Sequence, residues 1–413
     1  MHIAIIGSGP AGCYLADHLL RLLPNASIDV IERLPVPFGL IRYGVAPDHQ
    51  GTKAVARVFD RVLSRDRVRF FGNVEVGRDV RLEELRSLYD AVVLATGASI
   101  DRQLGVPGEE LPGVVGSGAF VGWYNMHPDR NPPAIDGVRS AVIIGNGNVA
   151  LDVARILAKD STELSGSDLS QETLAWLAAQ PIETIHIVGR RRAADAKFND
   201  HELAELGTLQ RAQPVIADPE SLTGDSAVVK TLRSFAENAR TASVTINFHF
   251  SLTPLAFAGD NILQAVQFDS PTGEVTEIPA QLAVTCIGYE TRACCTAEPA
   301  NGVFANDNGR IGEGLYVVGW AKRGPSGTIP TNRVEAQQVA QRITQEITNG
   351  NRRGRQGLQH LLEQRGVAWV DYAGWKRIDA AELARADAQC CRRKLRTTAE
   401  MLDSARTGEL RPA

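Results

Sequence analysis

This chain has no C-x-x-C motif, no long apolar run and only a small net charge, and each of these features excludes a class of function. Its 413 residues include six cysteines and no C-x-x-C pair, so no zinc site, iron–sulfur cluster or thioredoxin-type redox pair is predicted and no metal is expected. The net charge of -4 is too small to predict a nucleic-acid or membrane partner. No apolar run is long enough to span a bilayer, and the first strand begins at residue 2 with no signal-peptide pattern before it. We therefore expect reduced thiols and a cytoplasmic protein.

What the chain does contain is a strand–turn–helix–strand unit that occurs twice. Residues 2–6 are an apolar run, residues 11–23 have helical spacing, and residues 28–32, IDVIE, read as a second strand. Residues 140–157 and 184–191 repeat this order. The pattern predicts an α/β protein made of two Rossmann-like dinucleotide-binding domains with parallel sheets, the second inserted in the first. The expected parts are residues 1–102 and 316–413 for the first domain, which ends in C-terminal helices, and residues 103–315 for the inserted domain.

Three other segments have compositions that predict their structure. Residues 33–50, RLPVPFGLIRYGVAPDHQ, mix three prolines and two glycines with apolar side chains, so we expect an irregular loop with a functional use. The polar residues 159–181 are expected to form a surface excursion from the second unit. Residues 350–357, GNRRGRQG, are the best linker candidate.

The first glycine turn has the G-x-G-x-x-G spacing, formed by Gly7, Gly9 and Gly12 between a strand and a helix. Such a turn lets the backbone approach a pyrophosphate, and the helix N-terminus supplies free N–H groups for the anion. Glu32 follows at the end of the second strand, where a carboxylate accepts hydrogen bonds from ribose hydroxyls and repels a 2′-phosphate. This site therefore suits FAD or NAD.

The second glycine turn, formed by Gly145, Gly147 and Ala150, has the G-x-G-x-x-A spacing. Its second strand ends not in an acid but in Arg190, Arg191 and Arg192, which can pair with a 2′-phosphate. This site therefore suits NADP(H). A protein with both sites can pass hydride from NADPH to a flavin, which then passes electrons to an acceptor.

Longer strings surround both turns: VPFGLIRYGVAPDH at 36–49, FFGNVEVG at 70–77, GWYNMHP at 122–128 and GWAKRGPSGTIPTN at 319–332. With the turns, they resemble the adrenodoxin reductase-type ferredoxin–NADP reductase family and its bacterial members. The resemblance covers nearly the whole chain. It implies a flavoprotein oxidoreductase that passes electrons from NADPH through FAD to a ferredoxin.

The same resemblance implies roles for individual residues. His49 and Glu202 match the pair that the family places near the nicotinamide and the flavin, so they are the expected catalytic residues. The implied FAD-binding positions are Gly7, Gly9, Ala11, Gly12, Glu32, Leu40, Val76, Trp320, Gly327, Thr328 and Ile329. The implied NADP-binding positions are Arg102, Asn146, Gly147, Asn148, Val149, Arg190, Arg191, Glu202 and Gly327. The chain departs from the family pattern at Arg192, Lys197 and Pro330.

The implied partner is a small acidic ferredoxin, with a cytochrome P450 or another oxygenase as one destination for its electrons. Basic runs at 61–69, 351–355 and 391–396 are the candidate docking charges. Two alternatives use the same nucleotide sites: a flavin-dependent oxygenase or amine-oxidising enzyme with a small organic substrate, and a non-catalytic redox-sensing or scaffold protein.

Overall fold

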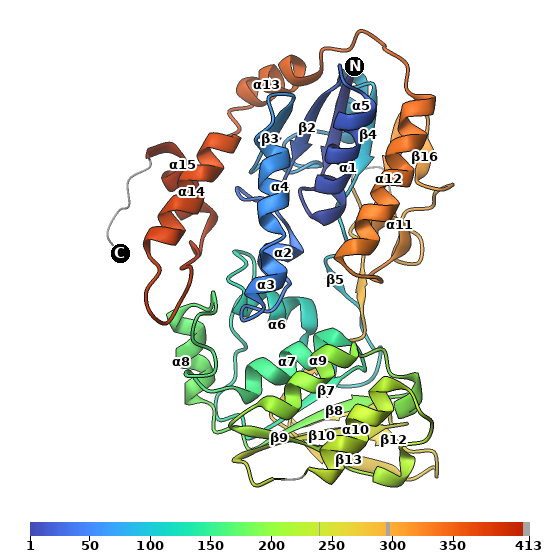
Figure 1. Ribbon diagram of the computed structural model, residues 1–413, viewed down its shortest axis with the longest axis vertical. Helices are drawn as coiled ribbons and strands as arrows, with labels where there is room; N and C mark the ends of the chain where they lie inside the picture. Colours follow the sequence, from blue (N-terminus) through green and yellow to red (C-terminus); the bar gives the residue numbers. More distant parts are fainter. Residues whose placement is uncertain (239, 295–297, 408–413) are drawn as a thin grey trace.

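Two six-stranded sheets organise the chain, one in each half of an elongated molecule (Figure 1). The computed structural model describes residues 1–238, 240–294 and 298–407. Among these residues, no helix is both long and apolar enough to cross a membrane.

The sheet of the first half has the order β16-β17-β4-β1-β2-β3, and every pair except β16–β17 is parallel. Its strands are β1 (His2–Ile6), β2 (Ser27–Ile31), β3 (Val68–Phe71), β4 (Ala91–Leu94), β16 (Arg310–Gly312) and β17 (Leu315–Val317). Because β17 returns to pair with β4, the intervening chain is an insertion, as the repeated unit predicted. The strand β16 already belongs to this sheet, so the chain re-enters the first half slightly before the expected domain boundary at residue 315.

Helices cover both faces of this sheet, which explains why its strands read as continuous apolar runs. In β1, Ile3 and Ile5 face one helical layer, whereas Ala4 and Ile6 face the other. The first layer contains α1 (Pro10–Leu22), α4 (Ala56–Leu63), α12 (Ile329–Glu346), α14 (Tyr372–Ala384) and α15 (Thr398–Thr407). The second layer contains α5 (Leu82–Leu88), α11 (Trp320–Arg323) and α13 (Gly354–Gln364).

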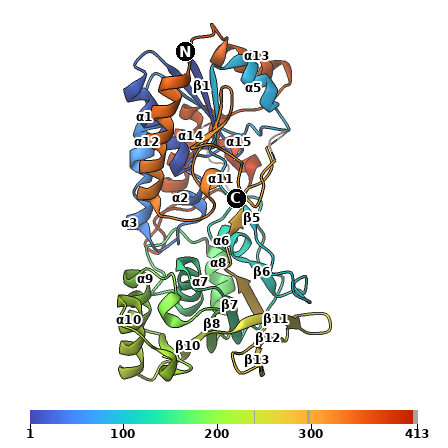
Figure 2. The same ribbon diagram turned by 90° about the vertical axis from the view of Figure 1, so that its right-hand side faces the viewer.

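The sheet of the second half is also parallel, with the order β6-β14-β7-β8-β10-β9. Its strands are β6 (Val114–Gly116), β7 (Ser140–Ile144), β8 (Thr184–Gly189), β9 (Ala212–Ile216), β10 (Val244–Phe250) and β14 (Leu282–Thr285). One face packs on α6 (Ser117–Tyr124), α7 (Asn148–Ala158), α8 (Gln171–Ala179), α9 (Asp200–Glu205) and α10 (Ala227–Glu237). The other face packs on an antiparallel sheet, β11 (Thr253–Ala258), β12 (Ala265–Asp269) and β13 (Val275–Pro279), at the opposite side of the half from α9 and α10 (Figure 2). A two-stranded ribbon, β5 (Ile100–Asp101) with β15 (Tyr289–Glu290), lies between the two halves.

Three local expectations were wrong. The loop 33–50 contains a helical turn, α2 (Leu40–Tyr43), because Phe38 and Gly39 adopt positive φ and re-aim the chain into a segment free of proline; α3 (Gln50–Lys53) follows it. The expected linker 350–357 includes the start of α13. The segment 159–181 is not a simple surface excursion, since Asp168 and Leu169 are 4% and 0% exposed.

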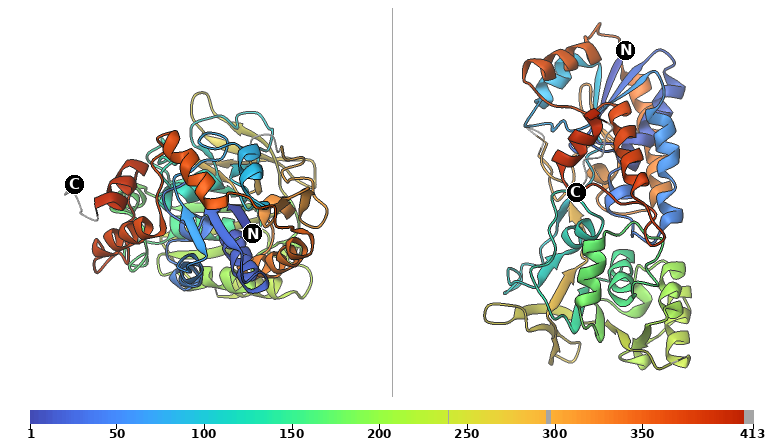
Figure 3. Two further views of the ribbon diagram at one scale, coloured as in Figure 1. Left: turned by 90° about the horizontal axis from the view of Figure 1, so that it is seen from above. Right: turned by 90° about the vertical axis from the view of Figure 1, so that its left-hand side faces the viewer.

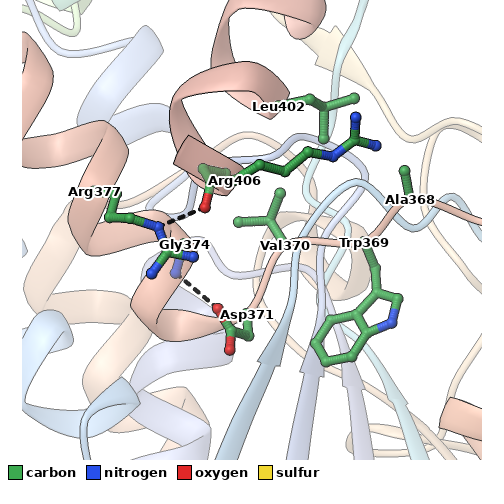
Figure 4. A pocket seen from close by; sticks show the side chains of 9 residues that line it. Ala368, Trp369, Val370, Asp371, Gly374, Arg377, Leu402 and Arg406 are labelled. Atoms are coloured by element: carbon green, nitrogen blue, oxygen red, sulfur yellow. Dashed lines mark hydrogen bonds between the residues drawn. The ribbon is translucent and has the colours of Figure 1, made fainter. Parts of the chain in front are cut away.

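A cavity of about 230 Å³ lies among the C-terminal helices, and its walls all come from residues 368–406 (Figure 4). Two hydrogen bonds order these walls. Asp371 caps α14 by accepting from the Gly374 N–H at 2.7 Å, and Arg377 Nε donates to the Ala405 carbonyl at 2.6 Å. The lining residues include none from either glycine turn, so we assign this cavity to the packing of the C-terminal helices.

Candidate active site

The first glycine turn needs glycine for two different reasons. Gly7 has a φ of +111°, and a Cβ on it would lie 2.3 Å from the Ala95 carbonyl oxygen. A Cβ on Gly12 would lie 2.1 Å from the Gly7 carbonyl oxygen, so only glycine lets α1 pack this close to the turn. Gly9 is different, because a Cβ there would meet nothing within 4 Å. Its backbone therefore faces open space at the N-terminus of α1, which fits a bound pyrophosphate.

Glu32 lies beside this turn at the end of β2, where hydrogen bonds fix its carboxylate. The carboxylate accepts from the Ser8 N–H at 3.0 Å, from the Ser8 hydroxyl at 2.6 Å and from the Leu34 N–H at 3.2 Å. Since a carboxylate offers about four acceptor positions, it can still receive ribose hydroxyls.

The loop 33–50 contacts the same turn. The Phe38 N–H donates to the Ser8 carbonyl at 3.2 Å, and a Cβ on Gly39 would lie 3.2 Å from the Gly9 Cα. Leu40 follows, and it remains 41% exposed although Ile41 beside it is 2% exposed. An exposed leucine next to a buried isoleucine fits a position that a bound ring would cover. Val76 is half-buried in a separate turn, bridged to Val80.

The segment 319–332 reaches the first turn from the other end of the chain. A Cβ on Gly319 would lie 2.6 Å from the Ala11 Cβ, so this glycine permits the close approach. Trp320 stacks on Tyr289 with a ring-centroid distance of 5.9 Å and donates through Nε1 to the Ser326 carbonyl at 3.1 Å.

The same segment then starts α12. Gly327 has a φ of +79°, and Thr328 caps the helix, whose first residue is Ile329. Pro330, which departs from the family pattern, lies in the first helical turn. Its missing N–H removes no hydrogen bond there, so the substitution leaves the helix start intact.

The second glycine turn repeats the geometry of the first. A Cβ on Gly145 would lie 2.3 Å from the Cys286 carbonyl oxygen, whereas a Cβ on Gly147 would meet nothing within 4 Å. The amide nitrogen and oxygen of Asn146 are buried without a hydrogen-bond partner in the described chain. Unpaired amide groups beside an open glycine backbone fit a site that a polar ligand completes.

A neighbouring segment, 196–199, covers this turn. The Lys197 N–H donates to the Asn146 carbonyl at 2.8 Å, and the Asn199 N–H donates to Asn148 Oδ1 at 2.7 Å. Lys197, another departure from the family pattern, thus contributes its backbone to the turn. Val149 is half-buried in the first turn of α7.

The three arginines after β8 are all exposed but are not equivalent. Arg192 pairs with Asp195 at 3.1 Å, whereas no ion pair of Arg190 or Arg191 occurs within the described residues. The latter two are therefore the guanidinium groups available to a phosphate. Arg102 follows β5 and lies 3.6 Å from Glu290 of the β5–β15 ribbon.

His49 meets the second half of the molecule, but its hydrogen-bond partner is not Glu202. His49 Nε2 lies 3.1 Å from Glu205 Oε2, and His49 Nδ1 lies 3.8 Å from Asp152 Oδ1. Glu202, one turn earlier on α9, keeps a buried carboxylate oxygen without a hydrogen-bond partner in the described chain. The sequence held a signal for Glu205, because residues i and i+3 of a helix share a face.

Arg155 organises these groups, and its role was not predicted. Its side chain is 1% exposed and donates to both oxygens of Asp48 at 3.0 Å. It also lies 2.8 Å from Asp152 and 3.5 Å from Glu205, the two carboxylates nearest His49. The only sequence signal was its i,i+3 spacing from Asp152 within the string NVALDVARIL.

Burial and charge shift the pKa values of the surrounding acids in opposite directions. Burial raises the pKa of Glu202 and of Asp152, and this effect outweighs the opposing positive charge of Arg155 and His49. Burial would raise the pKa of Asp48 as well, but hydrogen bonds from Arg155 and Lys159 hold it well below its usual range. The cluster can therefore keep carboxyl groups in different protonation states beside His49.

A cavity of about 420 Å³ opens next to this cluster. It is lined by Asp48, His49, Arg155, Lys159, Glu163, Glu205, Thr208, Leu209 and Gln210. In the part of the chain that the structure describes, no group of three histidine, cysteine, aspartate or glutamate side chains could hold a metal ion.

Known proteins share this architecture along nearly the whole chain. Residues 1–342 match the family model described as pyridine nucleotide-disulphide oxidoreductase. The chain is 40% identical to cindoxin reductase of Citrobacter braakii, over 98% of this chain and 91% of that protein. It is 37% identical to NADPH-ferredoxin reductase FprA of Mycobacterium leprae, over 93% of each chain.

A solved structure agrees with these matches. The structure of FprA from Mycobacterium tuberculosis in complex with NADPH has a TM-score of 0.92 at 36% identity, covering 98% of this chain and 99% of that one. The chain therefore belongs to the pyridine nucleotide-disulphide oxidoreductase family, among its adrenodoxin reductase-type ferredoxin–NADP reductases.

Proposed function

We propose that this protein is a ferredoxin–NADP+ reductase, a flavoprotein that passes electrons from NADPH through FAD to a ferredoxin. The observation that carries the proposal is that the two glycine turns have side chains of opposite charge beside them. Glu32 lies beside the first turn, whereas Arg190 and Arg191 follow the strand beside the second. His49 bridges the two halves by contacting Glu205.

The first turn is proposed to hold FAD and the second NADP(H). The open backbone at Gly9 would receive the FAD pyrophosphate, Glu32 its ribose, and the apolar surface at Leu40 its ring. The open backbone at Gly147 would receive the second pyrophosphate, with Arg190 on the 2′-phosphate. Bound FAD supplies the ability to accept hydride from NADPH and to release the two electrons singly.

The chain's own residues are proposed to orient the nicotinamide and to handle protons around it. His49 would hold or exchange a proton at Nε2, the nitrogen that faces Glu205. Glu202, with its unpaired oxygen, would complete its hydrogen bonding with the bound nicotinamide. Arg155 would keep both His49 neighbours in place through its ion pairs.

The proposed electron acceptor is a small acidic ferredoxin, with a cytochrome P450 or another oxygenase as its further partner. Relatives named for cindoxin, adrenodoxin and ferredoxin support an iron–sulfur protein as the acceptor. Among the basic runs, 391–396 offers little free charge, because Lys394 is 5% exposed and Arg392 and Arg393 form internal ion pairs. The runs at 61–69 and 351–355 stay as the docking proposals. Cysteine usage supports a cytoplasmic location as a further proposal.

The direct test mixes the purified yellow protein with NADPH without oxygen and follows the flavin absorbance band by stopped flow. Rapid bleaching by NADPH, slow bleaching by NADH and re-oxidation by added ferredoxin are expected. Re-oxidation should slow as salt screens the complementary charges. Bleaching that requires a small organic substrate, with oxygen incorporated into it, would instead support a flavin-dependent oxygenase.

A further inference from the structure

A strap from the C-terminal region ties the two halves together. The strap, residues 385–396, leaves α14, descends toward α8 and returns to α15 (Figure 1 and the right-hand view of Figure 3). Where the strap meets the second half, the Gly166 N–H donates to the Gln389 carbonyl at 2.8 Å. The Cys391 N–H donates to the Ser167 carbonyl at 3.0 Å, so the strap adds an extended segment to the second half.

Next to this contact, three charged side chains from three distant segments meet out of solvent. Lys53 Nζ lies 3.0 and 2.9 Å from the two carboxylate oxygens of Asp168, and Lys394 Nζ lies 2.8 Å from one of them. The side chains of Lys53, Asp168 and Lys394 are 9%, 5% and 1% exposed. Asn125 joins the lysines, accepting from Lys53 at its side-chain oxygen, 2.9 Å, and from Lys394 at its carbonyl, 3.1 Å. Asp168 belongs to the second half, whereas both lysines belong to the first.

The strap is also anchored to the first half. Glu382 on α14 is fully buried and accepts from Arg392 at 3.0 Å and from the Leu395 N–H at 2.9 Å. Arg42 from the loop 33–50 pairs with the same carboxylate. Lys394 is therefore held in place from the first half when it binds Asp168.

The position of these contacts gives them a mechanical role. The β5–β15 ribbon and the strap lie at opposite sides of the region between the halves in Figure 1. The Asp48–Arg155 and His49–Glu205 contacts also join the halves. The strap adds a further connection at the side away from the ribbon, where it opposes opening about the ribbon as a hinge. Breaking a buried ion pair leaves an uncompensated charge, so separation of the halves here is strongly disfavoured.

We propose that Lys53, Asp168 and Lys394 form an interdomain clamp, and that they are positioning residues for electron transfer between the two nucleotides. This proposal rests on the proposed function, because each nucleotide would be bound by a different half. Loosening the clamp would then misplace the nicotinamide against the flavin without removing either binding site. Misplacement by about 1 Å lowers a transfer rate by roughly 100-fold.

The test uses Lys394→Met in the full-length holoenzyme, with Lys230→Met as the matched control. The control removes an exposed lysine of α10, and the test variant keeps the Lys53–Asp168 pair. Three quantities are measured: flavin per chain, the NADP+ dissociation constant, and the flavin reduction rate at saturating NADPH. Hydrogen exchange of residues 164–169 and 389–391 is followed in parallel.

For Lys394→Met we expect full flavin content, an NADP+ dissociation constant within about threefold of the unmodified value, and a saturating reduction rate lowered roughly 10- to 100-fold. Exchange should become faster in both segments, and Lys230→Met should change none of these quantities. If Lys394→Met does not fold, Lys394→Gln, which keeps a donor for Asp168, is measured in its place.

A double-mutant cycle tests whether the residues act as one unit. Asp168→Asn should lower the reduction rate at least as much as Lys394→Met, and the double variant should lose little more than Asp168→Asn alone. Additive losses, or faster exchange with an unchanged saturating rate, would overturn the positioning role. Absence of flavin reduction by NADPH in the unmodified protein would instead refute the proposed function, while the exchange data would still report on the clamp.

Discussion

Coenzyme preference is the sharpest test of the charge at the second glycine turn. Arg190 and Arg191 are exposed and free of ion pairs within the described residues, so a 2′-phosphate can pair with them directly. A hydrogen bond to a charged group contributes about 1.5–3 kcal/mol, or roughly one to two decades of affinity. Because both side chains reach solvent, which screens the interaction, we expect the lower value. Replacing either by alanine should raise KM for NADPH about tenfold and leave KM for NADH nearly unchanged.

The control for this experiment is Arg192→Ala. Arg192 already pairs with Asp195 at 3.1 Å, so its loss should raise KM for NADPH by less than about threefold. KM for each coenzyme is measured by steady-state reduction of ferricyanide, for the unmodified protein and for the three arginine variants. Equal use of NADPH and NADH by the unmodified enzyme, or a larger effect from Arg192 than from its neighbours, would refute the assignment.

Four further outcomes follow from the site. Flavin released by heat should run as FAD on chromatography, since FMN would leave Glu32 without a ribose. Leu40→Asp should lose flavin, because it places a charge where the apolar ring is expected. His49→Gln should keep its flavin but slow reduction roughly 3- to 30-fold. This is less than a positioned proton-transfer group usually contributes, because the flavin and the nicotinamide carry the hydride. An unchanged reduction rate across about pH 6 to 9 would refute a catalytic role for His49. The depressed pKa of Asp48 contributes stability that is present above its unfolded pKa and is lost as pH falls through the folded value. The melting temperature of Asp48→Asn should therefore lie below that of the unmodified protein at about pH 7, and the gap should narrow below about pH 4.

The nucleotide turns could be predicted because their determinants are local. Gly7 and Gly12 stand where any Cβ would strike the backbone, and the short stretch of sequence around them records that requirement. The apolar strands β1 and β7 could also be predicted from a short stretch of sequence. Each is buried on both faces, so its residues form a continuous apolar run. Insertion of one domain in the other was also predicted, and the pairing of β17 with β4 confirms it.

The contacts between the halves could not be predicted, because each depends on segments far apart in the chain. His49 selects Glu205 over Glu202 only once α9 is docked against the loop 33–50, and the two glutamates are equally acidic in the sequence. The run at 391–396 illustrates the same limit more strongly. Charged residues are seldom fully buried without a partner, so a basic run reads as a solvated face until its counter-charge is located. For Lys394 of this run the counter-charge is Asp168, from a polar segment that itself reads as solvent-exposed, so the burial of each of these two residues depends on the other.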